Sequence, residues 1–153
     1  MKMQAFPQAR QNAGEVGVGG LALLALSTAA EVCEGVPEEQ ARGFFHAIGK
    51  RMGALEPLEG VNDASVLRAR INAFWQALDW GEVDLAVGKD SIIVEHRDLP
   101  NNIAADSEGH WAMMLLAVLE GAYDGWFRVL GSGPALTTTA QWKGNTVELR
   151  HGR

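Results

Sequence analysis

An α+β fold, with four helices and a small antiparallel sheet made of two hairpins, is predicted for this chain of 153 residues. Apolar residues recur with helical spacing through most of the chain. Two stretches in its second half instead alternate apolar and polar residues with the period of a strand. Each of these stretches is divided by a glycine-containing turn, which is typical of a hairpin. The length and the 47% hydrophobic content fit a single domain over residues 1–153, with helices on one side of the sheet.

The N-terminal part divides into an arm and a first helix. Residues 1–14 are polar and non-periodic, and Pro7 interrupts any helix there, so they are expected to form an extended arm outside the body at 15–153. The apolar run at 15–34 predicts a buried first helix, which either the core or another subunit must cover. A secretory signal is the alternative for this run, which is too short to span a membrane.

Two amphipathic helices are predicted next. Pro37 suits the first turn of the second helix, and Pro57 closes the segment. Asn62 or Asp63 can cap the third helix by accepting hydrogen bonds from free backbone N–H groups. The apolar positions repeat at intervals of three and four residues; they are Ala41, Phe44, Phe45, Ile48, Met52 and Leu55, and then Leu67, Ile71, Phe74, Trp75 and Leu78.

The rest of the chain supplies the sheet and a fourth helix. The stretch at 82–97 is typical of two short strands around a turn at 88–90, and 136–151 is typical of a second pair around 143–145. Between them, 109–130 is the longest and most apolar helical segment. Its small residues, among them Gly121, Ala122 and Gly125, allow another backbone to approach closely.

The composition argues against several kinds of chemistry. A net charge of −6 argues against a nucleic-acid partner, because neutralising phosphates needs a basic face. The four histidines are scattered without metal-ligand spacing, and Cys33 is the only cysteine, so no metal site or other cofactor is expected. Ser132 lacks the spacing of a hydrolase nucleophile. Among 19 acidic residues some pairing is inevitable, so paired carboxylates carry little weight, and no catalytic residue is assigned.

An excess of apolar helix and five tryptophans in one small domain indicates self-association. The candidate interface residues lie on the first and fourth helices: Leu21, Leu24, Trp111, Met114 and Trp126.

Four stretches in the same order resemble a known family. They are 44–53, the Leu-Asp-Trp-Gly at 78–81 with its following strand, Ile-Val-Glu-His at 93–96 with Leu-Pro at 99–100, and Trp111 followed by 118–123 and Trp126. Together they are similar to the D subunit of the bacterial cellulose synthase complex. The resemblance implies a non-catalytic accessory subunit that forms a cylindrical homo-octamer, a tetramer of dimers. It also implies partners among the other synthase subunits and passageways for β-1,4-glucan chains.

In that family the N-terminal segments are thought to face the polymer, a role that would fall here on the arm before Gly14. Within the arm, side-chain chemistry alone selects Lys2, Gln4, Phe6 and Gln8, which can donate to sugar hydroxyls or stack on a pyranose ring. The expected location is the cytoplasmic side of the inner membrane, with the periplasm as alternative. Two rival functions remain: an adaptor that organises synthase complexes without touching glucan, and a small glycoside-active enzyme.

Overall fold

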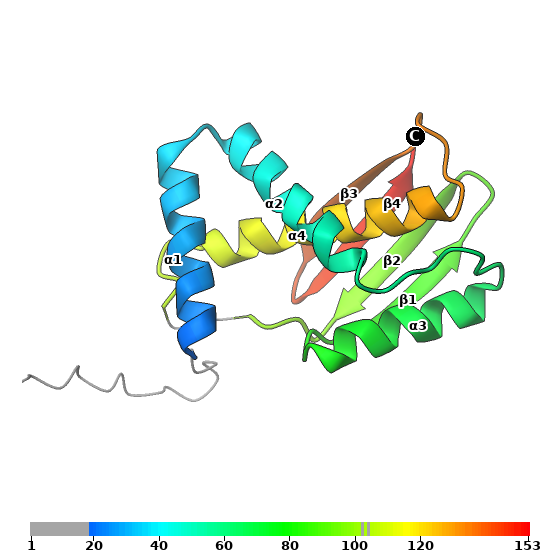
Figure 1. Cartoon of the computed structure of the whole chain (residues 1–153), viewed down its shortest axis with the longest axis horizontal. Helices are drawn as coiled ribbons and strands as arrows, with labels where there is room; N and C mark the ends of the chain where they lie inside the picture. Colours follow the sequence, from blue (N-terminus) through cyan, green and yellow to red (C-terminus); the bar gives the residue numbers. More distant parts are fainter. Residues whose placement is uncertain (1–18, 102, 104) are drawn as a thin grey trace, which may run out of the picture.

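The computed structural model describes residues 19–101, 103 and 105–153, which form four helices and four strands (Figure 1). The α+β prediction is therefore confirmed. In chain order the elements are α1 (Gly20–Gly35), α2 (Glu38–Gly53), α3 (Ala64–Ala77), β1 (Glu82–Val87), β2 (Ser91–Arg97), α4 (His110–Val129), β3 (Thr137–Lys143) and β4 (Thr146–Gly152).

The four strands form one antiparallel sheet in the order β1-β2-β4-β3. Val94 lies opposite Leu85 on β1 and Leu149 on β4, so these side chains share one face of the sheet. That face is buried beneath the helices. The opposite face carries ion pairs, including Arg97–Asp84 at 2.8 Å and Lys143–Glu148 at 2.6 Å. The expectation of helices on one side of the sheet is thus correct.

Helix α4 runs across the sheet and supplies much of the core, while α2 crosses over it (Figure 1). The crossing is close because two glycines face backbone. A Cβ built on Gly49 would lie 1.9 Å from the carbonyl oxygen of Val118, and one on Gly121 would lie 1.9 Å from that of His46. The expected close approach at Gly121 is real, and only glycine fits at either position.

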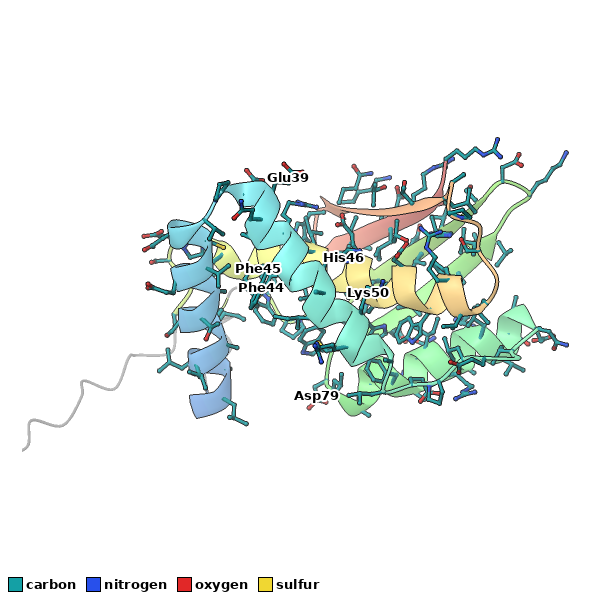
Figure 2. All side chains as sticks on the ribbon, turned by 45° about the horizontal axis from the view of Figure 1, so that its top comes forward. Glu39, Phe44, Phe45, His46, Lys50 and Asp79 are labelled. Carbon is teal, nitrogen blue, oxygen red and sulfur yellow. The ribbon has the colours of Figure 1, made fainter. Side chains whose placement is uncertain are left out.

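The ends of α2 and α3 follow local chemistry. Figure 2 shows Glu39 at the beginning of α2 and Lys50 near its end, an arrangement that complements the helix dipole. Asp63 is the N-cap of α3, and its carboxylate accepts hydrogen bonds from the backbone N–H groups of Ser65 and Val66. Of the two caps predicted, Asp63 is the one used.

Side chains from the helices occupy both edges of the sheet. The amide of Asn72 on α3 accepts from the N–H of Val83 at 2.7 Å and donates to its carbonyl at 2.9 Å. At the other edge, Glu120 on α4 accepts from the N–H of Ala140 at 2.8 Å. Glu120 is also paired with Arg42 on α2, which ties three elements together.

A buried chain of hydrogen bonds joins α3, α4 and the sheet. The indole of Trp75 donates to the hydroxyl of Tyr123 at 3.0 Å, and this hydroxyl donates to Nδ1 of His96 at 3.3 Å. Nε2 of His96 then donates to the carbonyl of Trp80 at 2.6 Å. Since a carbonyl can only accept, the imidazole is the neutral tautomer with its proton on Nε2. Burial lowers the pKa of His96 to about 4, which keeps the ring neutral.

Helix α1 differs from the expectation of a buried first helix. Its predicted beginning at residue 15 lies outside the described residues, and the helix as described begins at Gly20 with Gly19 as N-cap. Only Leu26 and Ala29 are buried, because α1 lies at one end of the molecule, away from the sheet (Figure 1). Within a single chain, the prediction of a buried helix is wrong.

Candidate functional site

The most exposed apolar surface on a described helix is on α1. Leu21 is 86% exposed, Leu24 64% and Leu23 50%. Leu21 and Leu24 lie on the same side of the helix, and Leu23 lies about 100° further round, because a helix turns by about 100° per residue. The three are called here the α1 leucine face. Exposing three leucines of one helix costs free energy that burial against another surface would recover, about 1.5–3 kcal/mol for each side chain. Two of the three, Leu21 and Leu24, are among the candidate interface residues predicted from the sequence. They are candidates because their helix has little polar surface.

The candidates on α4 are placed differently. Met114 is 8% exposed and Trp126 is 2% exposed, so both belong to the core of their own chain. The indole of Trp126 donates to the carbonyl of Gly53 at 2.8 Å, and that of Trp111 donates to the carbonyl of Pro100 at 2.7 Å. Contacts within the chain therefore account for the burial of these aromatic side chains.

The four candidates for glucan contact, Lys2, Gln4, Phe6 and Gln8, lie outside the described residues. In the sequence, the arm that carries them precedes α1, the helix with the leucine face.

A cavity of about 690 Å³ lies between the β1–β2 turn, the end of α4 and the last residues of the chain. On its wall, the hydroxyl of Ser132 donates to Nε2 of His151 at 2.5 Å. Nδ1 of His151 donates to the hydroxyl of Thr138 at 2.8 Å, and Thr138 donates to Asp124 at 3.2 Å. The sequence gives no sign of the pairing between Ser132 and His151, because the two residues meet only when β3 and β4 pack against α4.

These bonds hold the imidazole in the tautomer that accepts the Ser132 proton, which a general base would also require. Burial and the charge of Arg128 lower the pKa of His151 and favour its neutral form. Arg128 also donates to the carbonyls of Gly133 and Leu136, the latter at 2.5 Å, so the network fastens the loop after α4 to the sheet. A structural role accounts for every bond in it.

The same cavity bears on the glycoside-active alternative. Two carboxyl side chains on opposite sides of the scissile bond are the usual requirement for glycoside hydrolysis. Asp90 is the one acidic side chain among the described residues that line the cavity. The cavity therefore lacks the acid pair that this alternative needs.

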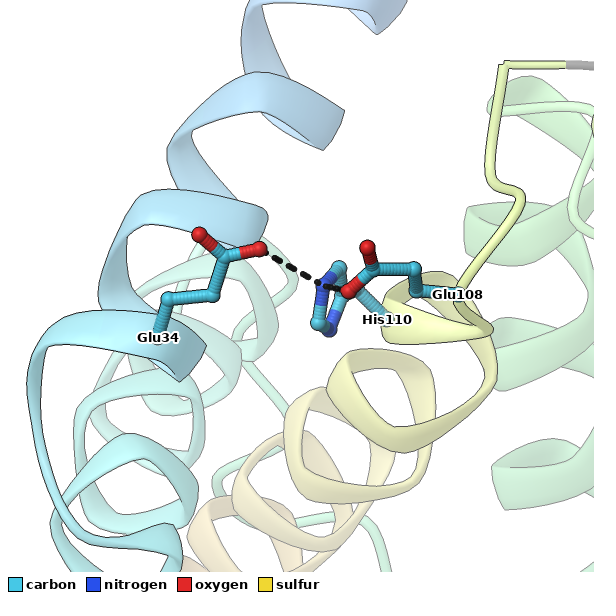
Figure 3. A group of neighbouring side chains, drawn as sticks. All are labelled: Glu34, Glu108 and His110. Carbon is cyan, nitrogen blue, oxygen red and sulfur yellow. Dashed lines mark ion pairs between the residues drawn. The ribbon is translucent and has the colours of Figure 1, made fainter.

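One group of described side chains could hold a metal ion. Glu34, Glu108 and His110 meet where the end of α1 approaches the beginning of α4 (Figure 3).

An apolar helix surface left open by its own chain is typical of a subunit of a larger assembly. A family model that describes the D subunit of cellulose synthase matches residues 23–152. The chain belongs to this family and has a role in the cellulose synthase complex, as the resemblance of its motifs predicts. A search of curated proteins found no match.

Within the described part of the chain, no helix combines the length and apolar character needed to cross a bilayer.

Proposed function

We propose that this chain is a non-catalytic accessory subunit of the cellulose synthase complex that assembles with copies of itself and guides nascent glucan chains. The exposed α1 leucine face carries this proposal, since a helix surface of this kind requires a partner. Membership of the family indicates that the complex in which this subunit works is cellulose synthase. The full assembly is the homo-octamer, a tetramer of dimers, implied by the motifs.

The arm before Gly14 contacts β-1,4-glucan in this proposal. Because the arm precedes α1 in the sequence, an interface built on α1 brings the arm near the place where two subunits meet. Lys2, Gln4, Phe6 and Gln8 then offer hydrogen bonds and one aromatic ring to the polymer. A glucan chain that must slide past the subunit needs several weak contacts and no tight binding site. A short polar arm therefore suits this guiding role better than a deep pocket does.

The subunit acts on the cytoplasmic side of the inner membrane, with the periplasm as alternative. A purely adaptor role is the second candidate function. It uses the same α1 interface but assigns no contact between the arm and glucan.

Disrupting the α1 leucine face tests the assembly. Replacing Leu21 and Leu24 together by glutamate puts two charges where the partner surface must be apolar, so the large oligomer is expected to break into smaller species. Mass measured by sedimentation velocity or light scattering on the full chain reports this directly.

Leu55→Glu is the matched control for this experiment. Leu55 follows the end of α2 and is 77% exposed, so Leu55→Glu places a charge at an exposed leucine position outside the proposed interface. It is expected to leave the mass unchanged. A wild-type chain that is monomeric, or a double variant with the wild-type mass, contradicts the proposed interface.

A further inference from the structure

Three potential metal ligands converge from two segments that are far apart in the sequence. Glu34 lies in the last turn of α1, Glu108 precedes α4, and His110 is the first residue of α4 (Figure 3). Nε2 of His110 is 3.2 Å from a carboxylate oxygen of Glu108 and 3.8 Å from one of Glu34. All three ligand atoms lie within 4.8 Å of one another.

The imidazole nitrogen is the unusual member of this group. Nε2 of His110 is buried and has no hydrogen-bond partner, although the Glu108 carboxylate lies nearby. A buried polar atom without a partner costs about 1–3 kcal/mol. The two carboxylates are largely exposed, at 65% for Glu108 and 63% for Glu34, so they can adjust toward a shared ion at small cost.

The two separations from His110 to the carboxylates fit a transition metal. Ligands about 2.0–2.1 Å from a tetrahedral zinc ion lie roughly 3.4 Å from each other. The two measured separations, 3.2 Å and 3.8 Å, fall on either side of this value. An imidazole with two carboxylates favours zinc or a similar ion over calcium, which takes six to eight oxygen ligands.

The surroundings are suitable for a cation. A cavity of about 160 Å³ adjoins the group and leaves room for water as a fourth ligand. Its described lining includes three acidic residues, Glu34, Asp106 and Glu108, with no lysine or arginine among them.

We propose that Glu34, Glu108 and His110 bind one divalent transition-metal ion, with zinc as the best fit, and thereby fasten the end of α1 to the beginning of α4. The spacing of histidines along the sequence does not indicate such a site, because its ligands come together only in the fold. The ion fixes the direction of α1, which its own chain otherwise holds through the buried Leu26 and Ala29 and the partly buried Val32 and Cys33. Binding of the ion does not depend on any contact with glucan.

The test uses the full chain without a histidine tag, titrated with Zn²⁺ in competition with a chromophoric chelator. One ion per chain is expected for the wild type. Glu34→Gln and His110→Gln are each expected to weaken binding by at least about tenfold, because each removes one ligand. Co²⁺ in place of Zn²⁺ is expected to give the visible absorption of a four-coordinate site.

Two variants serve as controls. Glu31→Gln changes an exposed acid on α1, and His46→Gln changes a histidine on α2 outside the cluster, so both are expected to bind as the wild type does. A hydrogen-exchange comparison adds a readout of the link, since Zn²⁺ is expected to slow exchange in the last turn of α1 for the wild type but not for Glu34→Gln.

Three results would overturn the proposal. The first is a wild-type chain that takes up no stoichiometric Zn²⁺, which would leave only the close contacts between His110 and the two carboxylates. The second is binding that is equally strong in Glu34→Gln, which would remove the link to α1. The third is equal weakening by the control variants, which would show that the ion binds the acidic surface in general.

Discussion

His96 lies fully buried on β2, between Tyr123 and the carbonyl of Trp80. Its ring must stay neutral, because one nitrogen donates to a carbonyl while the other accepts from a hydroxyl. A proton added to Nδ1 would face the Tyr123 hydroxyl without a negative partner in the chain of bonds. Burial accordingly lowers the pKa of this histidine from 6.5 to about 4.

Acid is therefore expected to destabilise the fold through His96. Between about pH 6.5 and pH 4 the unfolded chain binds this proton more readily than the folded one, so the free energy of unfolding falls as the pH falls. The full effect is roughly 3 kcal/mol, at about 1.4 kcal/mol for each unit of pKa. Urea unfolding at a series of pH values measures it.

The matched pair of variants is His96→Gln and His46→Gln. His96→Gln is expected to be less stable at pH 7 but to lose stability less steeply on acidification, whereas His46→Gln keeps the wild-type slope. An unchanged slope in His96→Gln would assign the acid sensitivity to other groups, among them the buried His151.

At the scale of elements, the crossing of α2 and α4 depends on two glycines. The two backbones are in direct contact there, so a single added methyl group would clash with the facing backbone unless the two helices moved apart. The contact also positions α4, which carries Glu120 to the edge of β3 and Trp126 to the end of α2.

Gly121→Ala and Gly49→Ala are each expected to destabilise the protein by about 3 kcal/mol or more, because the new Cβ would lie 1.9 Å from a carbonyl oxygen. Gly43→Ala is the control on α2. No atom lies within 4 Å of its Cβ position, so a gain of about 0.5–1 kcal/mol from better helix propensity is expected. Denaturant unfolding measures all three, and wild-type stability in Gly121→Ala would contradict the packing described.

The positions of the helices and strands can be predicted from local sequence better than the contacts that each element makes with the rest of the molecule. The hairpins and the Asp63 cap follow from chemistry between residues close in sequence, which is why their positions agree with the structure. The exposure of α1 could not be predicted, since an apolar helix has the same sequence pattern whether its own core or a second chain covers it. The Ser132–His151 pair and the Glu34–His110 group form only when distant segments pack, so spacing gives no sign of them.

At the scale of the whole molecule, the exposed leucines and the arm belong to neighbouring segments of the sequence. Assembly and contact with glucan would thus use adjacent but separable segments, since the leucine face lies on α1 and the proposed glucan contacts precede Gly14. This separation allows the guiding role to be distinguished from the adaptor role.

Deleting residues 1–13 is expected to leave the oligomer mass intact while lowering cellulose yield or disturbing fibre order in cells. Yield by weight and crystallinity by X-ray diffraction of the cellulose give the readout, beside the Leu21/Leu24 double variant as the assembly-deficient comparison. Normal cellulose from the truncated chain would favour the adaptor and remove the arm from the mechanism.

The side chains at the sheet edges bear on how the protein avoids wrong assemblies. An edge strand with free N–H and C=O groups invites pairing with a strand of another molecule, which leads to aggregation. Asn72 and Glu120 already occupy one backbone position on each edge, so an incoming strand would have to displace a side chain held by its own helix. The sheet edges are in this way protected from pairing with one another, so any association of this protein can use its helices without the sheets joining into fibrils.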